Sequence, residues 1–186
     1  MPSTEFVEVG SPKVGGYAYA GDLETAVPPT TAAAALVGYS SELGYVSEDG
    51  VTVTPQVETE DRKDWGGDVV RTLLTERGAE VTLTLIESGA VTLAEVFGED
   101  NVTVVGDAIH LSFDGEVMPH RRFVFELKDG DHVGRLVIND GQVTTPGGGE
   151  RQYTRTELKQ YEITIKCFRD ESGKFYHEYK DVEDDS

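Results

Sequence analysis

The sequence predicts a mainly β protein in which antiparallel strands form the body and one short helix flanks it. Three observations support this fold class: apolar and polar residues alternate with a period of two in several runs, Asp-Gly pairs lie between such runs, and one segment has a clear helical stripe. A chain of 186 residues is about as long as one typical domain and can bury a full core without metals or disulfides. We therefore expect residues 1–186 to form a single domain.

Four runs carry the alternating pattern. In each run the apolar residues share one face of a strand and the polar residues share the other, as in half-buried antiparallel sheets. The opposite faces, which include Arg122, Glu126 and Lys128, are expected to be wetted. The apolar faces comprise Val51, Val53 and Val57; Val81, Leu83 and Leu85; Phe123, Phe125 and Leu127; and Tyr161, Ile163, Ile165 and Cys167.

Asp-Gly pairs are expected to turn the chain between strands, because glycine readily adopts the positive φ of tight hairpins. We expect a meander in which residues 109–113 pair with the segment from His120, and in which strands pair across the last two of these turns. The pairs are Asp49-Gly50, Asp114-Gly115, Asp129-Gly130 and Asp140-Gly141.

The segment SGAVTLAEVFGED predicts the helix. Ser88 is the expected N-cap and Gly98 the expected stop. A helix this short is unstable alone, so its stripe must pack on the sheets. The stripe consists of Ala90, Leu93, Ala94 and Phe97, at i, i+3, i+4 and i+7.

Other segments are expected to be irregular. Residues 22–41 contain Pro28-Pro29 and predict an extended connection, and residues 58–68, ETEDRKDWGGD, predict a charged loop that interrupts two strands. Residues 181–186 predict an acidic, mobile tail.

The charge balance restricts the partners. Sixteen basic and 35 acidic residues give a net charge of −19, which repels phosphate backbones and anionic lipids. The first residues lack the basic and apolar stretches of a secretory signal, and no run is long and apolar enough to span a membrane. We expect synthesis in a cytoplasm, no membrane partner and no tight binding to nucleic acid.

No motif predicts an active site, a cofactor or a metal centre. The four histidines lack the spacing of metal ligands, and Cys167 lies alone in a strand-like run. The segment from Asp129 to Asp140 resembles a calcium loop only in part, because Val133 stands at a ligand position and Asp140 replaces the bidentate Glu. We therefore expect a protein that is not an enzyme.

Residues 38–105 contain a series of features in a characteristic order. An early hairpin, LGYVSEDGVTV, is followed by a charged loop with a tryptophan and glycines, VETEDRKDWGGDVVRT. Next come a strand ending in Glu87, AEVTLTLIES, and a short helix ending in Phe97-Gly98. This order resembles the major tail tube protein of long-tailed, siphovirus-like bacteriophages, and the opening, GGYAYAGDLETAVPPT, is similar to the entry segment of that family.

This resemblance implies an antiparallel β-sandwich or partial barrel with one short flanking helix. Six subunits would join sheet edges into a ring barrel, and stacked rings would form a virion tail tube that conducts DNA into the host. The tape measure protein and the tail terminator and tip proteins are the implied partners, with DNA passing through the lumen without specific binding. We expect acidic residues on the wetted strand faces to make the lumen electronegative.

Residues 58–68 are the candidate contact between rings. Buried tryptophans often carry interface energy, so Trp65 is the expected anchor, although it could instead cover an edge of its own core. Charged pairs would set register more than strength. The candidate assembly residues are Asp61, Arg62, Lys63, Asp64, Trp65 and Asp68.

Two other functions remain open at this stage. A stand-alone β-sandwich module for carbohydrate binding or adhesion would need a platform of exposed aromatics, for which Tyr17, Tyr19, Phe175, Tyr176 and Tyr179 are the candidates. A small hydrolase on a barrel would need a catalytic constellation, and the sequence offers no recognisable one.

Overall fold

The computed structural model describes residues 10–12, 17–129, 132–150, 155, 156 and 158–180. Within these residues an eight-stranded antiparallel sheet has the order β2-β1-β7-β8-β9-β4-β3, with β10 also paired to β8, and β5 and β6 form a separate hairpin. The strands are β1 (Ala18–Asp22), β2 (Ser41–Glu42), β3 (Val46–Lys63), β4 (Val69–Leu85), β5 (Val102–Val105), β6 (Ala108–Leu111), β7 (His120–Asp129), β8 (His132–Val143), β9 (Tyr161–Cys167) and β10 (His177–Lys180); the helix α1 spans Ala90–Phe97, and a 3-10 turn spans Glu99–Asn101.

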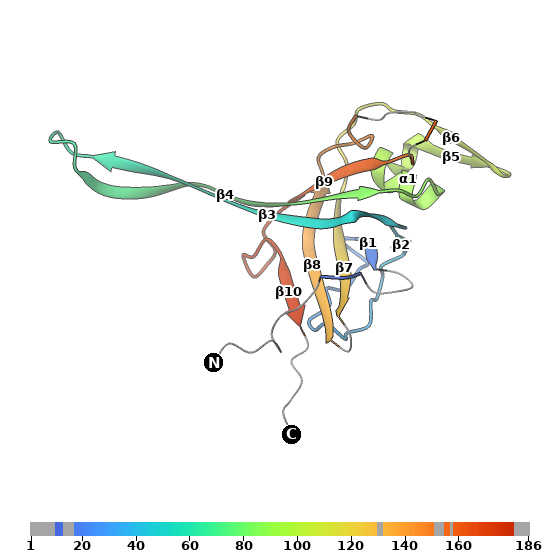
Figure 1. Ribbon diagram of the computed structural model, residues 1–186, viewed down its shortest axis with the longest axis horizontal. Coiled ribbons are helices and arrows are strands. Elements are labelled where there is room, and N and C mark those ends of the chain that lie inside the picture. Colours follow the sequence, from blue (N-terminus) through green and yellow to red (C-terminus); the bar gives the residue numbers. More distant parts are fainter. Residues whose placement is uncertain (1–9, 13–16, 130–131, 151–154, 157, 181–186) are drawn as a thin grey trace, which may run out of the picture.

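The sheet folds over on itself into two layers. One layer contains β1, β7, β8 and β10, and the other contains β3, β4 and β9 (Figure 1). The layers join where β8 meets β9, between the pairs Gly141–Cys167 and Val143–Ile165. Glycine is required at this corner, since a Cβ on Gly141 would lie 2.8 Å from Ile165 Cγ2. The predicted fold class is confirmed: the subunit is sandwich-like, and it is not closed into a barrel.

The core fills the space between the layers. The predicted apolar faces of β4 and β9 are buried throughout, and Phe123 and Phe125 of β7 face them from the other layer. Fully burying one such side chain contributes about 1.5–3 kcal/mol. Cys167 belongs to this core, as expected, and burial, aided by the charge of Glu80, raises the pKa of its thiol to about 12.

The second face of β7 is covered around Glu126, which corrects the prediction that this residue is wetted, whereas Lys128 is exposed as expected. Glu126 is buried and forms an ion pair with Arg135 of β8. Arg135 Nη1 also donates hydrogen bonds to the carbonyl oxygens of Thr31 (3.0 Å) and Ala34 (2.7 Å). The connection between β1 and β2, which lies within residues 22–41, therefore packs on this face through Arg135 and also through Arg122, whose Nη2 donates a hydrogen bond to the Leu23 carbonyl oxygen (3.0 Å).

Two of the predicted hairpin turns are wrong. Asp49-Gly50 lies inside β3, where the pairing shifts between Val46 and Val51, and Asp140-Gly141 lies inside β8 at the corner. Positive φ at Gly50 serves a bulge there, because an Asp-Gly pair fits a bulge as well as a turn. The pairing of β7 with β8 across residues 129–132 is confirmed.

The predicted pairing of residues 109–113 with the segment from His120 is also wrong. β6 pairs with β5, and residues 112–119 connect β6 to β7 without regular structure. Asp114 of this connection accepts hydrogen bonds from Asn101 Nδ2 (2.9 Å) and the Glu116 amide (3.0 Å). These contacts stabilise an irregular path that alternation alone does not reveal.

The predicted helix is confirmed as α1, with Gly98 as its C-cap at φ 96°. The predicted N-cap is wrong: Gly89 occupies that position, and the Ser88 hydroxyl lies 3.2 Å from the hydroxyl of Tyr161. Leu93 and Phe97 of the expected stripe are buried, and Val96 joins them. The helix therefore packs on one end of the sandwich through Phe97, which contacts Tyr161 edge-on at 6.1 Å between ring centroids.

Candidate functional site: a projecting assembly arm

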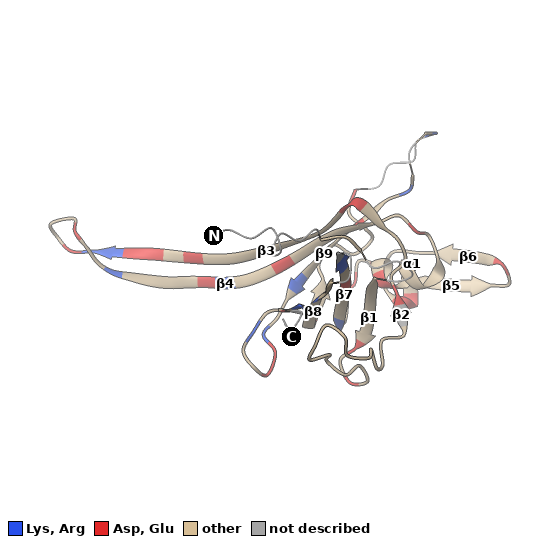
Figure 2. Cartoon of the chain, turned by 60° about the horizontal axis from the view of Figure 1, so that its bottom comes forward, with Lys and Arg blue, Asp and Glu red and all other residues tan. Residues whose placement is uncertain are grey.

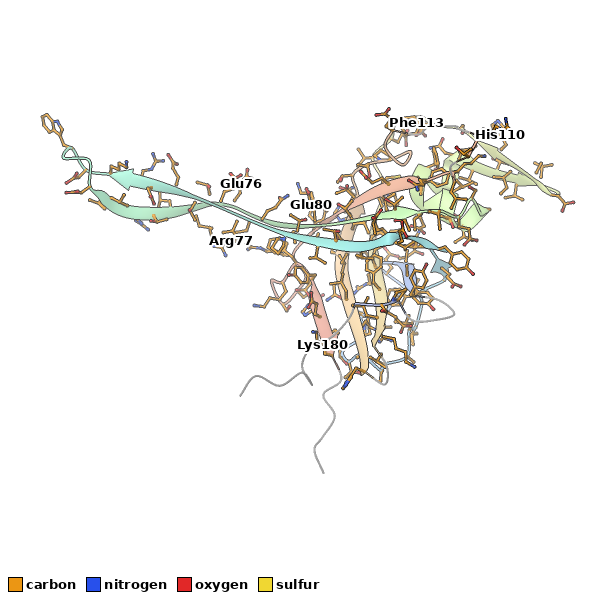
Figure 3. All side chains as sticks on the ribbon, in the orientation of Figure 1. Glu76, Arg77, Glu80, His110, Phe113 and Lys180 are labelled. Carbon is orange, nitrogen blue, oxygen red and sulfur yellow. The ribbon has the colours of Figure 1, made fainter. Side chains whose placement is uncertain are left out.

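β3 and β4 continue far beyond the body as a two-stranded ribbon (Figures 1 and 3). β9 pairs with β4 only from Leu85 to Ala79, and past Ala79 the two strands pair only with each other among the described residues. We call residues 56–78 the arm. A two-stranded hairpin is marginally stable in water, so a long arm with both faces exposed is the feature of this molecule that most needs a partner.

The arm corrects the prediction of a loop over residues 58–68. β3 continues to Lys63 and β4 begins at Val69, so only residues 64–68 leave the strands. Charged side chains do not prevent strand formation when both faces are in water, which explains why the charge of this segment was a misleading signal.

The tip is held by its own hydrogen bonds. The Asp64 amide donates to the Asp68 carbonyl (2.9 Å), and the Asp68 amide donates to Asp64 Oδ1 (2.9 Å). Gly67 has φ 93°, which a side chain would disfavour. Trp65 is fully exposed, so the alternative that it covers an edge of its own core is wrong. The tip presents an indole to solvent on a constrained turn.

The remaining candidate residues lie just below the tip. Asp61 Oδ1 accepts a hydrogen bond from Thr72 Oγ1 across the ribbon (2.7 Å), and Arg62 Nη2 lies 3.1 Å from Glu60 Oε2. Lys63 ends β3. The structure thus brings all six candidates together within the outer part of one arm.

Sequence reasoning missed Val69, Val70 and Leu74 of the arm, and its placement of Val57 on the packed face of a strand is wrong. Val57, Val69, Val70 and Leu74 are all exposed, between 42% and 67% of their surface. Each would contribute about 1.5–3 kcal/mol if it were fully covered. The run VVRTLL in β4 is the signal that could have identified them, but such a run is more typical of a buried strand.

Comparison with known families places this arm in context. A family model described as phage tail tube protein matches residues 12–181. The chain belongs to this family. Tail tube proteins are structural components of the virion and not enzymes.

Other comparisons add little to the family assignment. Ten solved chains match this tail tube protein. One of them is in the six-fold symmetrised cryo-EM structure of the anti-feeding prophage baseplate, with 10% identity, 91% of this chain and 97% of that chain covered, and a TM-score of 0.33. A TM-score this low supports no conclusion about fold or assembly. No curated protein matches.

A second hairpin also projects from this tail tube protein. β5 and β6 extend from the end of the body opposite the arm (Figure 1). Val104, Val105 and Ile109 of this hairpin are exposed, and so is Phe113 just beyond it. Apolar side chains on two projecting ribbons are typical of a subunit that is completed by neighbours.

A groove of about 320 Å³ opens between the layers at the base of the arm. Val51, Val53 and Leu136 line its apolar wall, and Lys128 and His132 lie among its polar residues. Among the residues that the structure describes, no group of three or more His, Cys, Asp or Glu could hold a metal ion. None of the described helices is long and apolar enough to cross a membrane.

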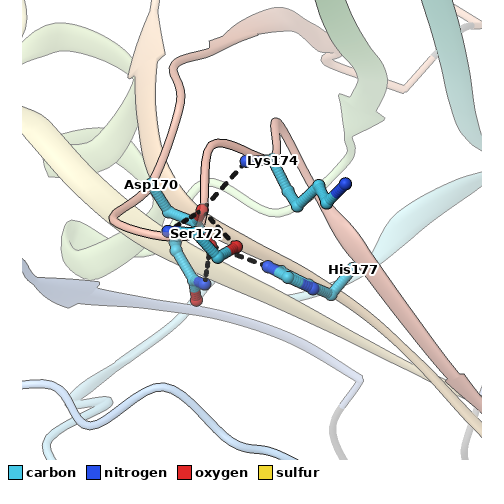
Figure 4. A network of polar contacts seen from close by, with 5 residues as sticks. Asp170, Ser172, Lys174 and His177 are labelled. Atoms are coloured by element: carbon cyan, nitrogen blue, oxygen red, sulfur yellow. Dashed lines mark hydrogen bonds and ion pairs between the residues drawn. The ribbon is translucent and has the colours of Figure 1, made fainter.

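Two histidines pair with aspartates. His120 Nδ1 lies 2.6 Å from Asp140 Oδ1, and His177 Nε2 lies 2.7 Å from Asp170 Oδ2. Burial alone would raise the pKa of Asp170, but hydrogen bonds from His177, Ser172, Asn139 and the Lys174 amide hold it well below its usual range (Figure 4). Asp170 thus ties β8, β10 and the turn between β9 and β10 together, which is a structural role.

The aromatic residues that a binding module would need do not form an exposed platform. Phe175 and Tyr176 are half-buried against the core, and the Tyr17 hydroxyl accepts a hydrogen bond from the Val46 amide (2.7 Å). Tyr179 stacks on His177. These residues serve the packing of the tail tube protein itself.

Proposed function

We propose that this protein is the repeating subunit of a sheathless, siphovirus-like tail tube, in which six copies form a ring and rings stack into a conduit for DNA. The arm is the observation that carries the proposal. It extends the sheet beyond the body as a two-stranded ribbon with exposed apolar side chains. A neighbouring subunit must cover these side chains to stabilise the ribbon. The family of the chain supports the same role.

Ring closure would use the free sheet borders. β3 is the last strand of the sheet, so its outer border from Val46 to Lys63 carries unpaired backbone groups within the described part of the chain. At the other end β2 pairs with β1 over two residues only. Open borders favour association with another strand, and cyclic pairing of identical subunits satisfies every border.

Stacking of rings would use the arm. Its tip reaches farthest from the body (Figure 3). The turn at the tip contains the fully exposed Trp65, and tryptophan is enriched where interface energy concentrates. The register of the contact would be set by ion pairs between subunits, in which Asp61, Asp64 and Asp68 pair with Arg62 and Lys63. Exposed pairs of this kind contribute only about 0–1 kcal/mol each, so apolar burial would supply most of the affinity.

The outer face of the β3-β4-β9 layer is the face we assign to the lumen. Its rows are rich in threonine, with Thr52 opposite Thr82 and Thr82 opposite Thr164. Glu80 and Glu162 add negative charge, which Lys166 opposite Glu80 offsets in part. A hydroxyl-rich, weakly acidic wall lets a polyanion slide, because negative charge repels phosphates over about 8–10 Å at ordinary salt. Phage whose subunit carries the double substitution Glu80→Gln/Glu162→Gln should then eject DNA more slowly. Unchanged ejection kinetics would contradict this assignment.

In this role the protein would be made in the host cytoplasm and assemble around the tape measure protein. Terminator and tip proteins would bind the two ends of the tube. DNA would pass through without specific contacts, in keeping with the net charge of −19.

Electron microscopy of concentrated protein tests the proposal. The wild-type chain should form rings or hollow tubes with six-fold symmetry. The matched variant replaces residues 57–77 by Asn-Gly, which can close a two-residue hairpin between the paired residues Gln56 and Gly78. This armless chain should stay folded, by circular dichroism, but form no tubes. A wild-type chain that stays dispersed, or an armless chain that forms tubes, would contradict the proposal.

A further inference from the structure

Like charges face each other at two positions along the arm. Glu58 pairs with Glu76, and Arg62 pairs with Arg71, in the register of β3 and β4. Residues directly opposite in an antiparallel pair lie on the same face with their Cβ atoms about 4.5–5.5 Å apart, where like charges destabilise the pairing. We call these the acidic pair and the basic pair. A ribbon built to be stable alone would place opposite charges at these positions.

Both pairs lie on one face of the arm. Glu58, Glu60 and Arg62 alternate with the other face along β3, and the 3.1 Å contact between Arg62 and Glu60 places their side chains together. The 2.7 Å hydrogen bond between Asp61 and Thr72 marks the opposite face. The two pairs lie four positions apart along β3, which is about 13 Å at the rise of an extended strand.

The charges of the two pairs are largely uncompensated within the subunit. Glu58, Glu76 and Arg71 are exposed, and none has an ion-pair partner within the described residues. In this described part of the chain only Arg62 of the four is paired, with Glu60 of its own strand. Figure 2 shows blue segments on both strands beside the tip and red segments on both strands nearer the body. The face thus presents a basic zone and an acidic zone in fixed order.

A second arm carries the complementary pattern. If two arms lie side by side and are displaced by about four residues, the acidic pair of one meets the basic pair of the other. Strands in a closed barrel tilt by about 35–45°, which displaces neighbouring strands in this way. We propose that the arms of neighbouring copies contact each other, acidic pair against basic pair, and that this contact sets their stagger. This inference rests on the proposed function, since it needs assembled copies.

Charge reversal tests the contact. The acid-reversed variant is Glu58→Lys/Glu76→Lys, and the base-reversed variant is Arg62→Glu/Arg71→Glu. Each reversal keeps like charge opposite like charge, so the repulsion across the hairpin is preserved. Because each variant alone places like charges against each other at the contact, it should lower the assembled fraction about ten-fold or more, measured by sedimentation.

Rescue by a combined variant is the decisive part of the experiment. The combined four-residue variant restores the pattern with signs exchanged, and it has the net charge of the wild type, so it should assemble again. A mixture of the two double variants should also assemble, because arms with two basic pairs then meet arms with two acidic pairs. The charge-matched control, Glu24→Lys/Glu171→Lys, changes two exposed residues of the body and should assemble like the wild type.

The outcomes separate this inference from the proposed function. A wild-type chain that stays monomeric overturns both. Wild-type tubes together with normal assembly of either double variant overturn the arm-to-arm contact alone. The contact is also overturned if the four-residue variant assembles no better than the weaker double variant, because the charged pairs then face a different surface.

Discussion

The two halves of β4 differ in what stabilises them, although one continuous strand forms both. From Ala79 to Leu85 the strand lies between β3 and β9, and Val81, Leu83 and Leu85 are buried. In the arm it has β3 as its one described neighbour, and Val69, Val70 and Leu74 are exposed. The inner half is stabilised by the subunit's own core, whereas the outer half depends on a neighbouring subunit.

The largest expected effect contrasts one aromatic residue from each region. Phe123→Ala removes a buried ring from the body and should lower the free energy of unfolding by about 3–5 kcal/mol. Trp65→Ala removes a fully exposed ring and should change the monomer by less than about 0.5 kcal/mol. Urea denaturation of dilute protein measures both. An equal loss in the two variants would mean that the tip packs on its own subunit.

The buried ion pair sharpens the description of the body. Arg135→Met removes the positive charge that faces the buried Glu126, and should cost about 3–5 kcal/mol in urea denaturation. The double variant Glu126→Gln/Arg135→Met removes both charges and should lose less than the single variant. A single variant as stable as the wild type would show that the second face of β7 is open to water.

A smaller, pH-dependent effect is expected at Asp170. Its pKa is depressed in the folded protein, so its contribution is complete at neutral pH and fades as the pH falls below about 4, where the unfolded carboxyl takes up its proton. Asp170→Asn should therefore cost about 1–3 kcal/mol at pH 7, and the difference from the wild type should shrink in acid.

The matched control for Asp170 is its exposed neighbour. Glu171→Gln should have the stability of the wild type at every pH, measured by urea denaturation between pH 2.5 and about 7. A difference between Asp170→Asn and the wild type that stays constant through this range would contradict the role of the charged carboxyl.

The spacing of apolar residues predicted those regions in which burial follows the period of the strand or helix. The alternation in β4 and β9 and the stripe of α1 gave the core, because burial there follows strand and helix periods. Burial of Glu126 was not predictable in this way. It depends on Arg135 from the next strand and on Thr31 and Ala34 from a distant connection.

The candidate site could be predicted in position but not in form. The six predicted assembly residues lie together near the tip of the arm, and whether they form the contact between rings stays a prediction. The alternation of residue types does not show where the pairing of β4 with β9 ends. The exposed Val69 and Leu74 could therefore not be distinguished from core residues. The like-charged pairs depend on register and on two bulges, which only the folded hairpin fixes.

Hydrogen exchange tests most directly the claim that a neighbouring subunit completes the arm. In the dilute monomer, amides of residues 56–78 should exchange much faster than those of residues 79–85, because a two-stranded ribbon opens more readily than a strand inside the body. In the assembled protein both regions should be protected. An arm that is as protected in the monomer as in the tube, or that stays unprotected in the tube, would contradict this account.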